Sequence, residues 1–216
     1  MRLLWLGLGL GLLLVLGCSP RATEPNLAQQ AEADLKVRQY RPLTGPLSTL
    51  VEDSTFQGVP TQVHPLLGHQ APDFQLQDTD DQPRRLSAFL QKGPVVLVFY
   101  YGYTCNHCVS QLFGLSKDIE KFRELGAEVV AISPDETQLT RQRYKTYGAF
   151  AFPVLWDPEN RIAEQYGCYD RKADEPTHGT FVIGQDGKIV WAYRGEEPFV
   201  NNRTLLVELY RYERKR

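Results

Sequence analysis

The chain has 216 residues, of which 42% are hydrophobic, and its formal net charge at pH 7 is −2. This length and apolar content suit one domain with a proper core, together with extensions outside it. Because the charge is small and the body of the chain has no basic stripe, nucleic acid is disfavoured as a partner.

Residues 1–17 are expected to be an export signal and not part of the fold. Arg2 provides a short positive region, and Leu3 to Leu16 form a Leu/Gly-rich run of 14 residues. A spanning helix needs about 20 apolar residues, so the run favours export over a permanent membrane span. The segment then ends in Val15-Leu16-Gly17-Cys18, which resembles the lipobox of bacterial lipoproteins. The resemblance implies that Cys18 is lipidated and anchors an exported protein to the periplasmic or extracytoplasmic face of the bacterial envelope. An ordinary cleaved signal with an incidental cysteine is the alternative.

Residues 18–65 are predicted to be a tether followed by an extended segment. From Pro20 to Gln39 the sequence is polar, and its apolar face is limited to Leu27, Ala31 and Leu35, so we expect a fraying or loose helix. The prolines and glycines between positions 41 and 65 exclude long helices and favour extended chain packed along the domain.

The globular domain is expected to span residues 66–216, with strands and helices that alternate before a final hairpin and helix. Apolar residues at a period near 3.6 and short β-branched runs predict these elements in chain order: a strand ending near Leu76, a turn at Asp78–Pro83, a helix at Leu86–Leu90, a strand at Val95–Tyr101, a helix at 105–125, a strand at Ala127–Ile132, a helix at Pro134–Tyr147, a strand at Phe152–Trp156, a helix at Asp157–Tyr166, paired strands at Thr180–Ile183 and Lys188–Tyr193, and a helix at Asn202–Tyr210. Helix-then-strand repeats of this length imply parallel crossovers. We therefore predict an α/β fold with a mixed sheet between helices.

A CxxC motif, Cys105-Asn106-His107-Cys108, follows the buried strand at Val95–Tyr101. At the N-terminus of a helix, free backbone N–H groups and the helix dipole favour a thiolate over a thiol. The i, i+3 spacing places both sulfurs on one helix face, close enough for a disulfide. A structural disulfide or a partial zinc site is the alternative, although structural zinc is disfavoured because a second CxxC is absent. An exported compartment is oxidising enough for such a disulfide to persist.

Beyond this motif, several blocks resemble the AhpC/TSA (peroxiredoxin-like) branch of the thioredoxin fold, and together they cover about 66–200. They are APDFQL at 71–76, GPVVLVFYYGYTCNHC at 93–108, VVAISPDE at 129–136, FPVLWDPENRIAEQYG at 152–167 and HGTFVIGQDGKI at 178–189. The resemblance implies a thioredoxin-like fold and an oxidoreductase that works by thiol–disulfide exchange or thiol-dependent peroxide reduction.

The sequence departs from the peroxiredoxin pattern Phe-Tyr-Pro-x-x-x-Thr-x-x-Cys at two positions that matter for chemistry, and at a third position downstream of it. Cys108 occupies the peroxidatic position, but Tyr101 replaces the proline and Cys105 replaces the threonine. His178 lies near the place of the family's arginine, and a histidine stabilises a thiolate by charge only when it is protonated. These departures favour disulfide exchange over peroxide reduction.

Each candidate site residue has an expected role and an alternative one. We expect Cys105 to be the exposed nucleophile and Cys108 to resolve the mixed disulfide. His107, placed as in the Cys-Pro-His-Cys of DsbA-like oxidants, is expected to favour the thiolate, and a solvent-facing side chain of little influence is the alternative. His178 is expected on a loop facing the CxxC, or else in a simple turn, and Thr104 is a further candidate. The remaining cysteine, Cys168, is expected to be buried and inert, with a resolving role as the alternative.

The sequence thus predicts an exported, lipid-anchored thiol-disulfide oxidoreductase. It would act on a protein or small-molecule disulfide or on a peroxide, with an external thiol as reductant and no cofactor. A thiol peroxidase with Cys108 as the peroxidatic residue is the near alternative.

A second alternative is a copper-binding module. Tyr100-Tyr101-Gly102-Tyr103-Thr104 resembles Sco-type chaperones, although the cysteines here are one residue closer, and two thiolates with His178 would suit copper. A third is a non-catalytic binding scaffold.

Overall fold

A computed structural model describes residues 26–103, 105 and 107–215 of the chain. The expectations for the signal at 1–17, for Cys18 and for Thr104 therefore concern positions outside the described residues. Within the described ranges, none of the helices combines the length and the apolar character needed to cross a bilayer.

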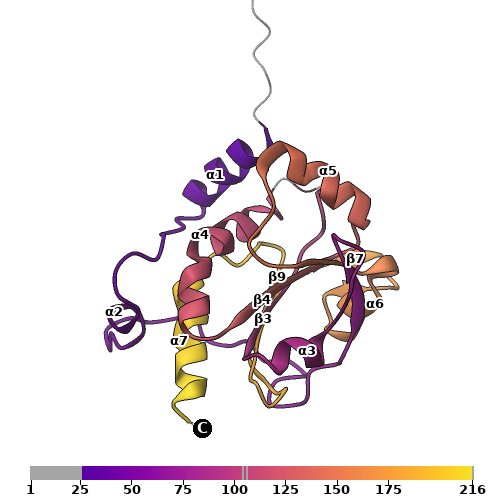
Figure 1. Cartoon of the computed structure of the whole chain (residues 1–216). Helices are drawn as coiled ribbons and strands as arrows, with labels where there is room; N and C mark the ends of the chain where they lie inside the picture. Colours follow the sequence, from indigo (N-terminus) through magenta and orange to yellow (C-terminus); the bar gives the residue numbers. More distant parts are fainter. Residues whose placement is uncertain (1–25, 104, 106, 216) are drawn as a thin grey trace, which may run out of the picture.

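A mixed sheet of seven strands, in the order β2-β1-β5-β4-β3-β8-β9, forms the centre of the described fold (Figure 1). Its strands are β1 (Gln75–Asp78), β2 (Pro83–Arg85), β3 (Val95–Phe99), β4 (Glu128–Ser133), β5 (Val154–Trp156), β8 (His178–Ile183) and β9 (Ile189–Gly195). The three strands β3, β4 and β5 run parallel, and β8 and β9 form an antiparallel hairpin beside β3. The predicted α/β architecture with a mixed sheet is confirmed.

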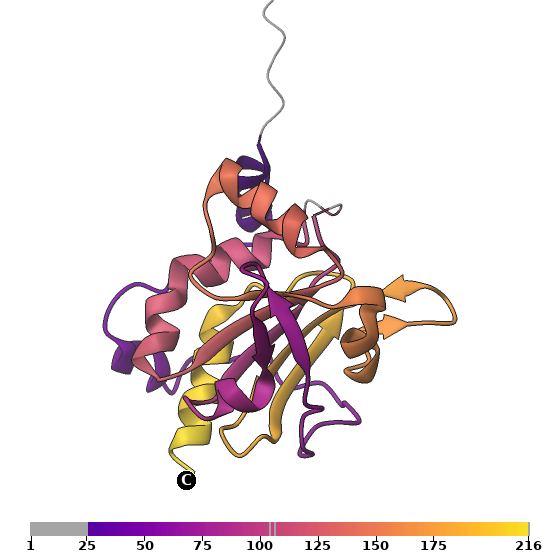
Figure 2. The ribbon, with the colours of Figure 1, turned by 45° about the vertical axis from the view of Figure 1, so that its right-hand side comes forward.

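Helices cover both faces of this sheet (Figures 1 and 2). They are α1 (Leu27–Val37), α2 (Leu47–Val51), α3 (Leu86–Leu90), α4 (Ser110–Glu124), α5 (Thr137–Tyr147), α6 (Arg161–Gln165) and α7 (Asn202–Glu213), with a short 3-10 turn η1 (Pro158–Asn160) before α6. Strand β3 is buried on both faces, as expected of a continuous β-branched run at the centre of a sheet. Val96 and Val98 contact the core beneath α4 and α7, whereas Val95, Leu97 and Phe99 contact the core beneath α3 and α6.

The strand registers bring two distant parts of the chain to the same end of the sheet. Phe99, the last residue of β3, pairs with Gly179 of β8, so His178 lies beside the loop that leaves β3. Ile132, near the end of the parallel strand β4, pairs with Phe99 on the other side. The carboxyl ends of parallel strands, where α/β proteins place their sites, therefore meet the start of β8 here.

Helix α4 begins at Ser110, five residues later than the predicted start at 105. Residues 107–109 form turns instead, and the Cys108 N–H donates to the Cys105 carbonyl at 3.1 Å. Apolar periodicity placed the body of the helix correctly but not its start. A turn preceding a helix has no periodicity of its own.

The N-terminal segment is held more firmly than the predicted loose helix. Asn26 caps α1, and its side chain and that of Gln29 each accept the other's backbone N–H at 3.0 Å, which forms a capping box. Ala31 and Leu35, the narrow apolar stripe, are buried against α4. A narrow stripe suffices here because Gly114 of α4 lets the Leu35 and Tyr40 side chains approach closely.

Several short elements were not predicted from the sequence. Helix α2 and strand β2 are a few residues long, and α7 continues three residues beyond the predicted Tyr210. The strands β6 (Tyr169–Asp170) and β7 (Glu175–Pro176) form a small hairpin that projects from the domain (Figure 2).

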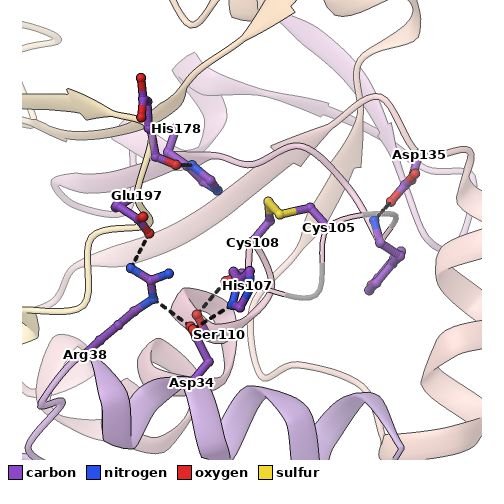
Figure 3. The surroundings of a disulfide bond; sticks show 11 residues. Asp34, Arg38, Cys105, His107, Cys108, Ser110, Asp135, His178 and Glu197 are labelled. Atoms are coloured by element: carbon purple, nitrogen blue, oxygen red, sulfur yellow. Dashed lines mark hydrogen bonds and ion pairs between the residues drawn. A yellow bond between two sulfur atoms is a disulfide. The ribbon is translucent and has the colours of Figure 1, made fainter.

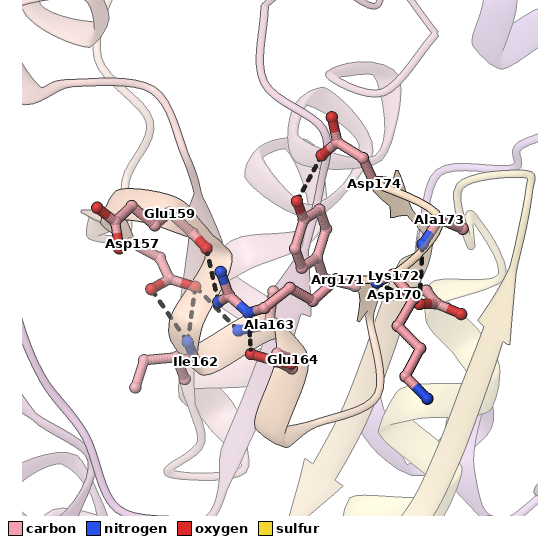
Figure 4. A network of polar contacts seen from close by, with 11 residues as sticks. Asp157, Glu159, Ile162, Ala163, Glu164, Asp170, Arg171, Lys172, Ala173 and Asp174 are labelled. Carbon is pink, nitrogen blue, oxygen red and sulfur yellow. Dashed lines mark hydrogen bonds and ion pairs between the residues drawn. The ribbon is translucent and has the colours of Figure 1, made fainter.

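The base of this projection is fixed by a buried carboxylate (Figure 4). Asp157 accepts hydrogen bonds from the backbone N–H groups of Ile162 and Ala163 at the start of α6, at 3.0 and 2.9 Å. Burial raises the pKa of Asp157, and these N–H groups oppose that effect. The exposed Arg171 of the hairpin donates to Glu164 of α6 at 2.8 Å.

Candidate functional site

A disulfide joins Cys105 and Cys108 in the turn between β3 and α4 (Figure 3). Their Cα atoms are 5.3 Å apart. Cys108 is fully buried in the core beneath α4, whereas Cys105 is partly exposed. The two sulfurs of the bond therefore differ in access, and a reactant arriving from solvent meets Cys105 first.

The loop that leads to this disulfide is held from the β4 side. Gly102 adopts a φ of +94°, and a Cβ built there would lie 2.6 Å from the Asp135 carboxylate. That carboxylate accepts a hydrogen bond from the Tyr103 backbone N–H at 2.7 Å. Burial raises the pKa of Asp135, while the Tyr103 N–H and Arg143 oppose the shift. Asp135 thus fixes the backbone two residues before Cys105.

His178 lies at the start of β8, on the other side of the disulfide from α1 in the view of Figure 3. Its Nδ1–H donates to the Glu196 carbonyl at 2.9 Å, and its ring stacks on Tyr101 with centroids 4.1 Å apart. The other nitrogen, Nε2, is buried and has no hydrogen-bond partner among the described residues.

Burial, reinforced by the nearby positive charge of Arg38, lowers the pKa of His178 to about 4. The side chain is therefore a neutral imidazole near pH 7. Near pH 7, His178 therefore cannot stabilise a thiolate by its charge, because its buried position disfavours the protonated ring.

His107 contacts the N-terminal helix instead of only solvent. Its side chain is 67% exposed, yet its Nδ1 lies 2.7 Å from Oδ1 of the buried Asp34 on α1. The other oxygen of Asp34 accepts from Nε of Arg38 at 2.7 Å, and Arg38 also pairs with Glu197. Although burial opposes the shift, hydrogen bonds from Arg38, Ser110 and His107 lower the pKa of Asp34. A carboxylate is thus held beside the disulfide loop.

Residues 67–192 match the family model of the AhpC/TSA family. The chain belongs to the AhpC/TSA family.

Curated relatives of this AhpC/TSA chain carry two kinds of name. The thiol-disulfide oxidoreductase ResA of Bacillus thuringiensis subsp. konkukian is 28% identical over 131 residues, which are 61% of this chain and 71% of ResA. Peroxiredoxin Q, chloroplastic, of Populus jackii is 31% identical over 163 residues, 75% of this chain and 73% of the relative. Both names describe oxidoreductases.

Solved structures agree with this family. Peroxidoxin BcpB from Mycobacterium tuberculosis superposes with a TM-score of 0.61 at 29% identity, covering 71% of this chain and 99% of BcpB. A Plasmodium vivax 2-Cys peroxiredoxin in its reduced form gives a TM-score of 0.60 at 20% identity, which speaks for the fold alone.

The AhpC/TSA domain contains one further thiol among its described residues, that of Cys168. It is free and buried, as predicted, and burial raises its pKa to about 12. Cys168 belongs to the core beneath α6, whereas Cys108 belongs to the core beneath α4, on the opposite face of the sheet. The resolving role considered for Cys168 therefore has no support in this geometry.

The copper alternative gains no support from the described part of the AhpC/TSA domain. There, no group of three or more His, Cys, Asp or Glu side chains is arranged to hold a metal ion. Cys105, Cys108 and His178 all belong to this described part of the chain.

Sequence reasoning missed three polar residues at the site of this AhpC/TSA domain. Asp34 lies 73 positions from His107, and no local pattern indicates a contact over that separation. Asp135 had a signal, since it follows a parallel strand whose end meets the end of β3. Gln111, one turn after Cys108, donates to the Thr180 hydroxyl at 2.8 Å in the buried interior.

Proposed function

We propose that this chain is a thiol-disulfide oxidoreductase in which Cys105 exchanges with the substrate and Cys108 resolves the intermediate. The observation that carries the proposal is the Cys105–Cys108 disulfide, with one sulfur accessible and the other fully buried. A substrate sulfur that approaches from solvent meets Cys105, and the buried Cys108 is left to attack from within. The ResA relatives, which are named thiol-disulfide oxidoreductases, support the activity.

The exchange steps balance as a two-electron transfer. In the reduced protein, the Cys105 thiolate attacks a substrate disulfide, forms a mixed disulfide and releases one substrate sulfur, which takes a proton. The Cys108 thiolate then attacks Cys105, closes the internal disulfide and releases the second substrate sulfur. Two electrons have passed from the dithiol to the substrate. An external thiol reductant restores the dithiol by the same steps in reverse.

Thiol-dependent peroxide reduction is the second candidate, favoured by the peroxiredoxin Q relatives and by the position of Cys108 within the family pattern. The Cys108 thiolate would attack one peroxide oxygen, become a sulfenic acid and release water or an alcohol. Cys105 would then condense with it, form the disulfide and release water. The complete burial of Cys108 argues against this route, because a peroxide must reach that sulfur directly.

Variants at the three cysteines separate the two candidates. Reduction of a model disulfide and consumption of hydrogen peroxide are measured for the wild type, Cys105→Ser and Cys108→Ser, with Cys168→Ser as the matched control. Disulfide exchange predicts that Cys105→Ser loses turnover and that Cys108→Ser accumulates a mixed disulfide. Peroxide turnover that persists in Cys105→Ser and disappears only in Cys108→Ser would favour the peroxidase. Normal disulfide turnover in Cys105→Ser would contradict the proposal.

We further propose that the protein is exported and anchored to the bacterial envelope through a lipid on Cys18. The apolar run before Val15-Leu16-Gly17-Cys18 and a disulfide suited to an oxidising compartment support this placement. Membrane fractionation of the full chain and of Cys18→Ser tests it. Anchoring predicts that only the wild type sediments with membranes, whereas equal distribution of the two forms would contradict it.

A further inference from the structure

We propose that Asp34, on helix α1, is a positioning residue of the redox loop: its carboxylate holds the His107 imidazole and places a negative charge beside the Cys105–Cys108 couple, which keeps that couple more reducing. The inference rests on the proposed function, since it concerns the reactivity of the same pair of sulfurs. It makes a helix outside the family match at 67–192 a working part of the site.

Helix α1 is docked firmly enough to hold a side chain in place. Beyond the buried stripe of Ala31 and Leu35, the Tyr40 hydroxyl donates to the Gly114 carbonyl of α4 at 3.3 Å. The Leu43 N–H donates to the Asp118 carboxylate, also on α4, at 2.9 Å. Because α4 begins directly after the disulfide turn, a helix fixed to α4 is fixed relative to the two sulfurs.

The Asp34 carboxylate is held by both of its oxygens. Oδ1 lies 2.7 Å from Nδ1 of His107, and Oδ2 accepts from Nε of Arg38 at the same distance. Arg38 is in turn held by Glu197, so the carboxylate has little freedom to turn away. Figure 3 shows this chain of contacts directly beneath the disulfide.

The charges around the disulfide loop determine whether Asp34 makes the Cys105–Cys108 couple more reducing or less reducing. Asp34 and Glu197 share the single cation Arg38, which leaves one net negative charge in this group of three on the α1 side. His178 on β8 is a neutral imidazole, and Asp135 faces the loop from the β4 side. A nearby anion disfavours a thiolate, and destabilising the reduced form makes a disulfide harder to reduce.

Asp34→Asn is the informative variant because its amide oxygen still accepts from His107 while the charge is removed. The matched control is Glu32→Gln, since Glu32 lies on the same helix and pairs with Lys117 of α4 at 2.7 Å, away from the CxxC turn. Two properties of the full chain are measured: the equilibrium with a glutathione redox buffer and the rate of thiol alkylation against pH.

We expect Asp34→Asn to shift the equilibrium with glutathione toward the dithiol. On the acidic side of the pH profile, its alkylation rate should rise about threefold, because one negative charge, partly screened by solvent and salt, has been removed. Glu32→Gln should behave as the wild type. Asp34→Ala should show the same shift and also slow disulfide exchange, because His107 loses its acceptor. An unchanged Asp34→Asn profile, a shift of opposite sign or an equal shift in Glu32→Gln would overturn the inference.

These readouts separate this inference from the proposed function. Alkylation reports the accessible thiol, that of Cys105, whether or not the protein turns over a substrate. If the wild type reduced no disulfide but Asp34→Asn still changed the alkylation profile, the proposed function would fail and the role of Asp34 would stand. If turnover followed the proposal while the profile of Asp34→Asn matched the wild type, the role of Asp34 would fail alone.

Discussion

The imidazole of His178 stacks on the phenol ring of Tyr101, with centroids 4.1 Å apart and planes inclined by 21°. Tyr101 stands in the loop after β3 and His178 at the start of β8, so the stack closes the end of the sheet beside the disulfide. The contact leaves the ring buried, with one nitrogen bonded and the other without a partner in the described part.

Because His178 is buried as a neutral ring, the free energy of unfolding should decrease as the pH is lowered. Its folded pKa of about 4 lies below the ordinary value of 6.5, so the unfolded chain binds the proton first as the pH falls. The contribution of the neutral His178 to the free energy of unfolding is fully present above pH 6.5 and is lost as the pH falls toward 4. The difference between the two pKa values corresponds to about 3 kcal/mol.

Urea unfolding at pH 7 and at pH 4.5 measures this loss. His178→Gln, which cannot titrate, should lose distinctly less stability over this interval than the wild type. The buried His64, whose pKa burial also lowers, contributes in the same direction to both proteins, so the difference between them isolates His178. Equal losses in wild type and variant would contradict the prediction.

Replacing Gly102 with alanine should destabilise the protein more than replacing Gly45. Both glycines have a φ of +94°, but a Cβ at Gly45 meets nothing within 4 Å, whereas at Gly102 it would push against the Asp135 carboxylate. The backbone cost, about 1–3 kcal/mol, is therefore shared. Loss of the Tyr103–Asp135 hydrogen bond should add about 1–3 kcal/mol to Gly102→Ala alone. Unfolding free energies of the two variants give the comparison, and equal values would show that Asp135 yields freely.

Cys168 should resist alkylation in the native protein. Burial raises its pKa to about 12, so at pH 8 almost none of it is thiolate, the reactive form. After reduction, mass spectrometry should find label on the partly exposed Cys105 in native buffer, and on Cys168 only after unfolding. Cys168→Ala should retain disulfide turnover. Rapid native labelling of Cys168 would contradict the burial described.

A side chain at Gly179 should be tolerated better once Cys168 is shortened. A Cβ at Gly179 would overlap the sulfur of Cys168 and press on the Phe181 ring. Overpacking of this kind typically costs about 1–3 kcal/mol, so Gly179→Ala alone should be destabilised on that scale. In a double-mutant cycle with Cys168→Ala, part of that loss should be recovered. If the losses in unfolding free energy of the two single variants simply added in the double variant, the strain of Gly179→Ala would not come from contact with Cys168.

The sequence by itself determined those helices, strands and turns that depend on residues close together along the chain. The apolar β-branched run of β3 predicts a fully buried strand, Gln185-Asp186-Gly187 predicts the β8–β9 hairpin, and both are present. The body of α4 and the crossover to β4 follow from periodicity as well. The CxxC spacing and the family blocks predicted a paired dithiol on a thioredoxin-like sheet, and the disulfide forms there.

Only the tertiary structure decided what surrounds the two sulfurs. The contact of Asp34 with His107 depends on how α1 docks on α4, and a periodic pattern shows which face is apolar but not which helix covers it. The neutral state of His178 depends on burial by Tyr101 and on the nearby Arg38, which are distant in sequence. Placement of Cys108 and Cys168 on opposite faces depends on the direction each segment takes from the sheet. Local sequence encodes the conformation of a segment, whereas desolvation and charge at a site arise from the segments packed around it.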